Sequence, residues 1–188
     1  LLPFFGGLTL VVGATLAIGE ADLKLKLAYT TVSSLGLLVM LIGFGSEHAV
    51  EAAALYLVAH CLFKGALFMV AGIIDHETGT RDVTRLGGLG RAMPLTWVIA
   101  LAAALSMAGL PPFFGFLAKE EIYTALIGGD IRALTFSAIT VFGNALMFAV
   151  AFAVALKPFL GQPVETPKHP HEAPVLLWLG PAVLAILG

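Results

Sequence analysis

One apolar segment that is interrupted in its middle constrains this sequence more than any other feature. The segment runs from Pro94 to Ile127, and crossing a bilayer takes about 20 apolar residues in a helix. Pro111 and Pro112 remove two backbone donors and clash with the preceding turn, so a straight helix cannot continue past Gly109. Within lipid, such a break is tolerated only where it is buried in protein or lines a hydrated cavity. The sequence therefore predicts a membrane helix bundle that contains a broken helix.

Three ionisable side chains follow the break inside the same apolar segment: Lys119, Glu120 and Glu121. A broken helix with charges beside the break is typical of ion sites in membrane proteins. The alternative is that these side chains mark a helix end and extend to the membrane interface, but apolar residues on both sides favour an ion site. Glu120 and Glu121 point about 100° apart on a helix. They cannot both face the break, and we expect at least one to partner a cation elsewhere.

The composition indicates a polytopic membrane protein. Of 188 residues, 59% are hydrophobic and 12% are charged, against about 25% charged in ordinary soluble domains. A formal net charge of −2 gives no sign of a nucleic-acid partner. The single cysteine excludes an internal disulfide and a cysteine-rich metal site, and the neighbours Asp75, His76 and Glu77 cannot easily converge on one ion. We therefore expect no metal and no cofactor.

Hydropathy predicts an all-α, polytopic transmembrane helix bundle. Besides the broken span at residues 94–127, complete spans are expected at about 1–19, 27–45, 51–74 and 131–156, which makes residues 1–158 the membrane domain. Residues 159–173 are expected to form a cytoplasmic loop, and 174–188 to begin a further, partial span. The sequence begins without a methionine or a signal peptide and stops inside an apolar segment. We therefore expect a chain that is truncated at both ends.

Basic residues in the connections predict the orientation. The connections after the second and fourth spans hold Arg132 alone, whereas those after the first, third and fifth hold Lys24, Lys26, Arg81, Arg85, Arg91, Lys157 and Lys168. Because short basic loops stay in the cytoplasm, we expect the connections after the first, third and fifth spans to be cytoplasmic. This holds provided that the broken segment crosses the membrane once. Within these loops, Arg81 and Asp82 are expected to act as ordering partners, and His169 and His171 to be solvated.

His60 and Lys64 lie one helical turn apart near the middle of the third span, and therefore on one face. A protonated lysine at mid-membrane costs at least about 2.5–3.5 kcal/mol, which water, a carboxylate or conversion to the neutral amine must offset. A desolvated lysine and a neutral histidine can both pass protons on. The structural alternative is a histidine bonded to a neighbouring helix and a lysine paired with a carboxylate. The paired spacing favours a proton relay.

Four further polar side chains have expected positions or accessory roles. Lys119 is expected beside the hydrated gap at the break, where unpaired backbone groups can hold water or an ion. Lys24 and Lys26 are interpreted most simply as anchors at the membrane interface, and Lys24 also as a link between its loop and the second span. Asn144 in the fifth span is expected to form a hydrogen bond between helices, with lining of an ion pathway as the alternative.

Several motifs resemble a known family. The stretches Asp22–Gly36, His60–Phe68 and Gly115–Glu120 are similar to the proton-translocating membrane family shared by Mrp-type cation/proton antiporters and the antiporter-like subunits of respiratory complex I. Three more stretches look most like the large A subunit of the Mrp antiporters: IIDHETGTRD (73–82), RLGGLGRAMP (85–94) and AGLPPFFGFLAKE (108–120). The motifs occur in order and cover nearly the whole chain.

The resemblance implies that these spans form the second of two inverted five-helix repeats, whose fourth helix is broken. It implies that Lys64 with His60 forms the central proton relay, and that Lys119 is the terminal lysine that exchanges protons with an exit half-channel. The implied function is antiport of a monovalent cation, Na⁺, against H⁺ by one component of a hetero-oligomer in a prokaryotic plasma membrane. Such a component is a transporter rather than an enzyme.

Two alternatives stay open at the level of the sequence. The first is a proton-pumping, antiporter-like subunit of a quinone-reducing respiratory complex, in which the local chemistry would be the same. The second is a purely structural membrane scaffold, in which His60, Lys64 and Lys119 could be replaced by apolar residues with no loss of ion exchange.

Overall fold

The computed structural model describes all 188 residues and contains seven α-helices and no β-sheet, which confirms the predicted fold class. The helices are α1 (Leu2–Gly19), α2 (Leu23–Phe44), α3 (Glu47–Thr78), α4 (Pro94–Ala108), α5 (Phe114–Leu126), α6 (Ile131–Leu156) and α7 (Val175–Leu187), with two short 3-10 turns, η1 (Val83–Arg85) and η2 (Leu89–Arg91), between α3 and α4. Of these, α1, α2, α3 and α6 are each long and apolar enough to cross a membrane.

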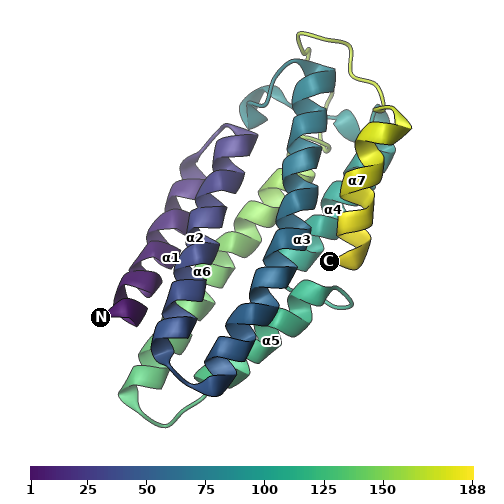
Figure 1. Cartoon of the computed structure of the whole chain (residues 1–188). Helices are drawn as coiled ribbons and strands as arrows, with labels where there is room; N and C mark the ends of the chain where they lie inside the picture. The colour runs from purple at the N-terminus through teal and green to yellow at the C-terminus, as the bar shows by residue number, and fades with distance from the viewer.

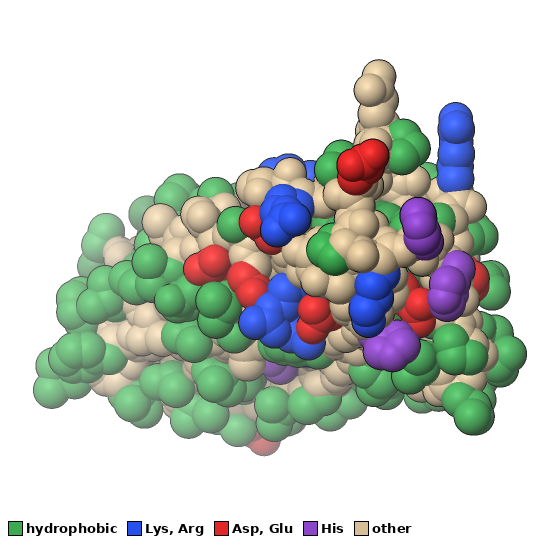
Figure 2. All heavy atoms as spheres, turned by 90° about the horizontal axis from the view of Figure 1, so that it is seen from above, with side chains coloured by type: hydrophobic (Ala, Val, Ile, Leu, Met, Phe, Trp, Pro, Cys, Tyr) green, Lys and Arg blue, Asp and Glu red, His purple; other side chains and the backbone are tan.

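The long helices run side by side, and their connections divide between two ends of the bundle (Figure 1). The α1–α2, α3–α4 and α6–α7 connections lie at one end, and the α2–α3 and α5–α6 connections lie at the other. The helices α4 and α5 together pass from the first end to the second, so the broken segment traverses the bundle once. Charged and histidine side chains gather on the first end, and hydrophobic side chains surround it (Figure 2). We call it the basic end.

Capping residues, rather than hydropathy, set the ends of two helices. The helix α2 begins at Leu23, one turn before the predicted apolar span, because the Asp22 carboxylate accepts hydrogen bonds from the first free backbone N–H groups. The helix α3 extends beyond residues 51–74 at both ends. Ser46 caps its N-terminus through its side chain, and it ends at Gly79, whose φ of 75° suits a glycine.

The break lies where the sequence predicts it, because α4 ends at Ala108 and α5 begins only at Phe114. Gly109 has a φ of 78° and closes α4. The start of α5 then packs directly against the end of α4, since a Cβ on Gly115 would lie 1.9 Å from the carbonyl oxygen of Ser106. The tip of α7 covers this contact: the carbonyl oxygen of Gly188 accepts hydrogen bonds from the Gly115 N–H (3.3 Å) and the Ser106 hydroxyl (2.5 Å).

The helices α1 and α2 approach each other so closely that their backbones touch. A Cβ on Gly6 would lie 2.4 Å from the backbone nitrogen of Met40, and a Cβ on Gly36 would lie 2.5 Å from that of Leu10. The hydroxyl of Ser33 crosses the same contact and donates a hydrogen bond to the Leu10 carbonyl oxygen (2.8 Å). Small and hydroxylated side chains of α2 therefore serve close helix packing, as they commonly do in membranes.

Candidate functional site

Three lysine side chains are buried inside the bundle, although burial of a lysine is rare and costly. They are Lys26 of α2, Lys64 of α3 and Lys119 of α5, each only 4% exposed. None of the three has a carboxylate within ion-pair distance in this chain. Each amine is therefore held by neutral oxygen atoms, and these atoms define the candidate site.

The amine of Lys64 is held by α2. It donates hydrogen bonds to the carbonyl oxygen of Leu27 (3.1 Å) and to the hydroxyl oxygen of Thr30. Because the Thr30 hydroxyl itself donates to the Leu27 carbonyl oxygen (2.8 Å), the three groups form a closed triangle. The Lys64 side chain is thus fixed by groups that carry no formal charge.

Polar side chains continue from Lys64 along the α2–α3 interface. Thr30 and Ser34 lie four residues apart on α2, and Tyr56, His60 and Lys64 lie at the same spacing on α3. The hydroxyls of Ser34 and Tyr56 are hydrogen-bonded at 3.0 Å, and the ring centroids of Tyr56 and His60 lie 6.1 Å apart. All five side chains are buried. We call these five residues the α2–α3 polar line.

His60 is the member of this line with an unmet hydrogen-bonding requirement. Its ring lies edge-to-face against Phe63, with centroids 5.4 Å apart, and its Nδ1 atom is buried with no partner in the chain. A buried polar atom without a partner costs about 1–3 kcal/mol, and an internal water molecule is the usual remedy. His60 makes no hydrogen bond to a neighbouring helix, which was its structural alternative.

Lys119 lies at the break. Its amine donates a hydrogen bond to the carbonyl oxygen of Ala108 (3.2 Å), the last residue of α4. This carbonyl belongs to a helix C-terminus, where the helix dipole favours a positive charge. The side chain passes directly over Gly109, since a Cβ there would lie 2.5 Å from the Lys119 Cδ atom. Gly109 is therefore required both for its backbone conformation and for the space that Lys119 occupies.

Two open cavities meet at Lys119. One has a volume of about 410 Å³ and the other about 340 Å³, and Ala108, Lys119 and Tyr123 line both. Glu120 lines the larger cavity. Glu120 and Glu121 are exposed and form no ion pair with a cation of this chain. Lys119 therefore borders two cavities with some polar lining, whereas Lys64 lines neither of them.

Asn144 connects α6 to α5 beside the smaller cavity, which it also lines. Its side-chain amide donates a hydrogen bond to the Tyr123 hydroxyl (2.9 Å). Its Oδ1 atom is buried without a partner. The expected hydrogen bond between helices is therefore present, and the same side chain lines a cavity.

The two lysines at the start of α2 differ from each other. The amine of Lys24 forms an ion pair with Asp75 of α3 at 2.8 Å, which links α2 to the end of α3. Lys26 is not the interfacial anchor that the sequence suggested. Its amine donates to the carbonyl oxygens of Ala17 (2.7 Å) and Ile18 (3.1 Å) and so caps the C-terminus of α1. The spacing of Lys26 four residues before Thr30 was the signal that could have placed it on the buried face.

One expectation about the loops at the basic end was wrong. Arg81 pairs with Asp22 (Nε–Oδ2 2.5 Å) rather than with Asp82. The Asp82 carboxylate instead accepts hydrogen bonds from the hydroxyl and the backbone N–H of Thr84, which hold its pKa below the usual value. His169 and His171 are exposed, as expected for solvated side chains, and the Nε2 atom of His171 also lies 3.2 Å from the buried carboxylate of Glu77.

The structure thus brings His60 and Lys64 into one line and places Lys119 at a separate position. No hydrogen bond between side chains joins the α2–α3 polar line to Lys119, although α3 packs against α5. Lys24 belongs to neither group, because its ion pair lies at the basic end. The chain therefore offers two buried basic centres in one apolar bundle.

Comparison with known proteins identifies the family of this chain. A family model described as NADH:quinone oxidoreductase/Mrp antiporter, TM, matches residues 1–156. The chain is 42% identical to the A subunit of the Na(+)/H(+) antiporter of Alkalihalophilus pseudofirmus and 38% identical to that of Bacillus subtilis, and each alignment covers the whole chain. The chain spans about a quarter of the length of these relatives, 26% in both cases.

Solved structures give the same relationship. The Mrp complex from Dietzia sp. DQ12-45-1b matches with a TM-score of 0.86 and 40% identity, over 100% of this chain and 20% of that one. The membrane-bound sulfane sulfur reductase, an archaeal respiratory membrane complex, matches with a TM-score of 0.91 and 33% identity, over 100% of this chain and 31% of that one. Sequence and fold together place this multi-pass membrane chain in the NADH:quinone oxidoreductase/Mrp antiporter transmembrane family.

Proposed function

We propose that this chain belongs to one component of a monovalent cation/proton antiporter and conducts protons through His60, Lys64 and Lys119. The observation that carries the proposal is that Lys64 and Lys119 are buried in an apolar bundle and are held only by neutral oxygen atoms. A fixed carboxylate would lock a lysine in its charged form, whereas neutral acceptors leave the amine free to gain and lose a proton as its hydration changes. That freedom is what a relay needs.

The α2–α3 polar line supplies the first part of the route. The protonated amine of Lys64 releases a proton to an internal water molecule, and the neutral ring of His60, one turn away, accepts it. The buried Nδ1 of His60 has no partner and marks a place for such a water. The hydroxyls of Thr30, Ser34 and Tyr56 can each donate and accept hydrogen bonds along the same line.

Lys119 supplies the exit. Its amine takes a proton from water on the side of the polar line and releases it to water in the cavities beside the break. Water must bridge the interval between Lys64 and Lys119, because no protein hydrogen bond does. Lysines repel cations, so a Na⁺ site would need carboxylates, and we assign none within this chain. Cation exchange is proposed for the whole hetero-oligomer in a prokaryotic plasma membrane, with the basic end in the cytoplasm.

The test is Na⁺-dependent proton movement in membrane vesicles that carry the full complex. Lys64→Ala and Lys119→Ala should each abolish exchange while the complex still assembles, as judged by its size on a native gel. Lys157→Ala is the matched control, because Lys157 is an exposed lysine that forms no ion pair or side-chain hydrogen bond. Normal exchange in either buried-lysine variant would contradict the assigned roles and would favour a structural scaffold.

A second function is supported by the likeness to an archaeal respiratory membrane complex and by the family's description. In that case the same residues would pump protons when a redox reaction drives them. The same vesicles distinguish the two functions. Proton movement that requires Na⁺ and proceeds without NADH supports antiport, whereas NADH-driven pumping that is independent of Na⁺ supports the respiratory role.

A further inference from the structure

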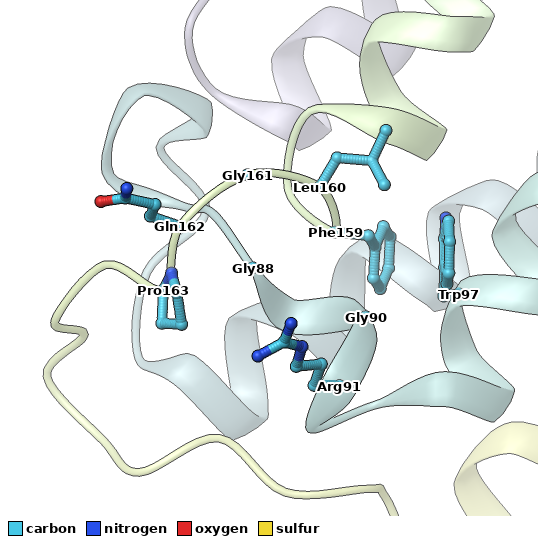
Figure 3. A pocket seen from close by; sticks show the side chains of 9 residues that line it. All are labelled: Gly88, Gly90, Arg91, Trp97, Phe159, Leu160, Gly161, Gln162 and Pro163. Carbon is cyan, nitrogen blue, oxygen red and sulfur yellow. The ribbon is translucent and has the colours of Figure 1, made fainter.

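A third cavity lies at the basic end, apart from the polar line and the break. Its volume is about 370 Å³, within the range of small-molecule sites. The wall is formed by the turn that contains η2, by residues 159–163 after α6 and by Trp97 in the first turn of α4. The side chain of Arg91 lies in the middle of these residues (Figure 3).

Glycines allow the two loops to form this wall. Gly88 has a φ of 69°, and a Cβ on it would lie 2.7 Å from the backbone nitrogen of Pro163. The backbone N–H groups of Gly88 and Gly90 donate hydrogen bonds to the carbonyl oxygens of Leu160 and Phe159, both at 3.0 Å. The loops are therefore joined by backbone hydrogen bonds, and the cavity is a fixed feature of the fold.

Arg91 is the only charged residue that lines the cavity. No aspartate or glutamate lies among its lining residues, and Arg91 forms neither an ion pair nor a side-chain hydrogen bond in this chain. At the same end, Lys24 and Arg81 are both paired with carboxylates. A guanidinium presents a planar set of donors that matches phosphate oxygens. Arg91 is thus suited to an anionic ligand, and to phosphate above all.

An apolar surface adjoins this cavity. The rings of Trp97 and Phe159 are stacked, with centroids 6.4 Å apart and planes 19° apart, and the indole N–H of Trp97 is buried with no acceptor. The next residue, Val98, is 62% exposed and continues the lipid-facing side of α4. Tryptophan is enriched where membrane helices meet the headgroup layer. A lipid at this end would therefore meet Arg91 with its headgroup and the exposed side of α4 with its acyl chains.

We propose that this cavity binds the phosphate group of an anionic phospholipid from the leaflet at the basic end. Arg91 is the ligand for the phosphate, and the exposed side of α4 near Val98 receives the acyl chains. Basic pockets between membrane helices on the cytoplasmic side bind lipid headgroups by the same chemistry. The apolar side of α4 is what favours a lipid over free inorganic phosphate. The site is separate from proton transfer and does not depend on it.

The test compares Arg91→Gln with Arg85→Gln in the purified, delipidated complex. Arg85 is an exposed arginine of the same loop that does not line the cavity, so the two variants remove the same charge. Phosphatidylglycerol, phosphatidylcholine and inorganic phosphate are added separately, and bound lipid is counted by native mass spectrometry alongside the thermal midpoint. We expect Arg91→Gln to weaken phosphatidylglycerol binding about fivefold, which corresponds to about 1 kcal/mol for one basic residue near the headgroups.

The controls separate the outcomes. Arg85→Gln should bind phosphatidylglycerol like the parent complex, and Arg91→Lys should keep part of the affinity. If Arg91→Gln and Arg85→Gln lost phosphatidylglycerol binding equally, the proposal would be overturned, because binding would then depend on the total positive charge of the loop and not on the cavity. Equal binding of phosphatidylcholine would overturn the preference for an anion. A rise in thermal midpoint with inorganic phosphate alone, dependent on Arg91, would replace the lipid with a free anion.

Discussion

Lys64 and Lys119 are both buried amines in one bundle, yet their surroundings differ. Lys64 lies in a closely packed interface, where Leu27 and Thr30 of α2 hold its amine. Lys119 lies over a glycine at the break, with a single acceptor in Ala108 and two open cavities beside it. In the proposed relay the two lysines therefore serve different steps: the enclosed lysine stores a proton, and the lysine at the break exchanges it with water.

The largest expected effect on exchange comes from replacing a buried lysine with arginine, whose charge cannot be lost. Arginine stays protonated in proteins, so Lys64→Arg and Lys119→Arg should each slow exchange by about a hundredfold or more, the scale of a lost acid–base group. Initial rates of Na⁺-dependent proton movement give the measurement, with Lys157→Arg as control. Retained exchange in Lys119→Arg would mean that this lysine acts only through its charge. The proposal that Lys119 gains and loses a proton would then be wrong.

A smaller effect should follow from loss of the hydroxyl that holds Lys64. Thr30→Val keeps the shape but removes an acceptor for a charged donor, worth about 1.5–3 kcal/mol, so we expect exchange to slow by about tenfold or more. Thr30→Ser should restore it. Thr140→Val is the matched control, because the Thr140 hydroxyl bonds only to the carbonyl oxygen of Phe136 in its own helix. Equal effects of the two valine variants would show that Thr30 matters for packing alone.

The smallest expected effect tests the break. Gly109→Ala places a side chain in a left-handed backbone conformation, which costs about 1–2 kcal/mol, and pushes against the Lys119 side chain. We expect a lower thermal midpoint together with slower exchange. Gly45→Ala is the control, because Gly45 also has a positive φ of 82°, but a Cβ on it would meet no lysine side chain and lies within 4 Å only of the carbonyl oxygen of Gly43. If both variants lose only stability, the passage of Lys119 over Gly109 has no part in transport.

The break and the His60–Lys64 pair could be predicted because both are local. Two adjacent prolines end a helix wherever they occur, and a spacing of four residues places two side chains on one face. The buried position of Lys26 could not be read from hydropathy, which assigns charges near a span end to the interface. It depends on where Asp22 starts α2 and on the approach of α1, a contact between separate helices. The contact of His171 with Glu77 is likewise set by chain folding over a long sequence separation.

The touching backbones of α1 and α2 limit how this bundle can move. With Gly6 and Gly36 in backbone contact and Ser33 hydrogen-bonded across the pair, we expect the two helices to move as one unit. Sliding or separating α1 and α2 would break these backbone contacts and the Ser33 hydrogen bond. We therefore expect any conformational change of the proposed transport cycle at the joint between α4 and α5 rather than between α1 and α2, with α3 packed against both α2 and α5.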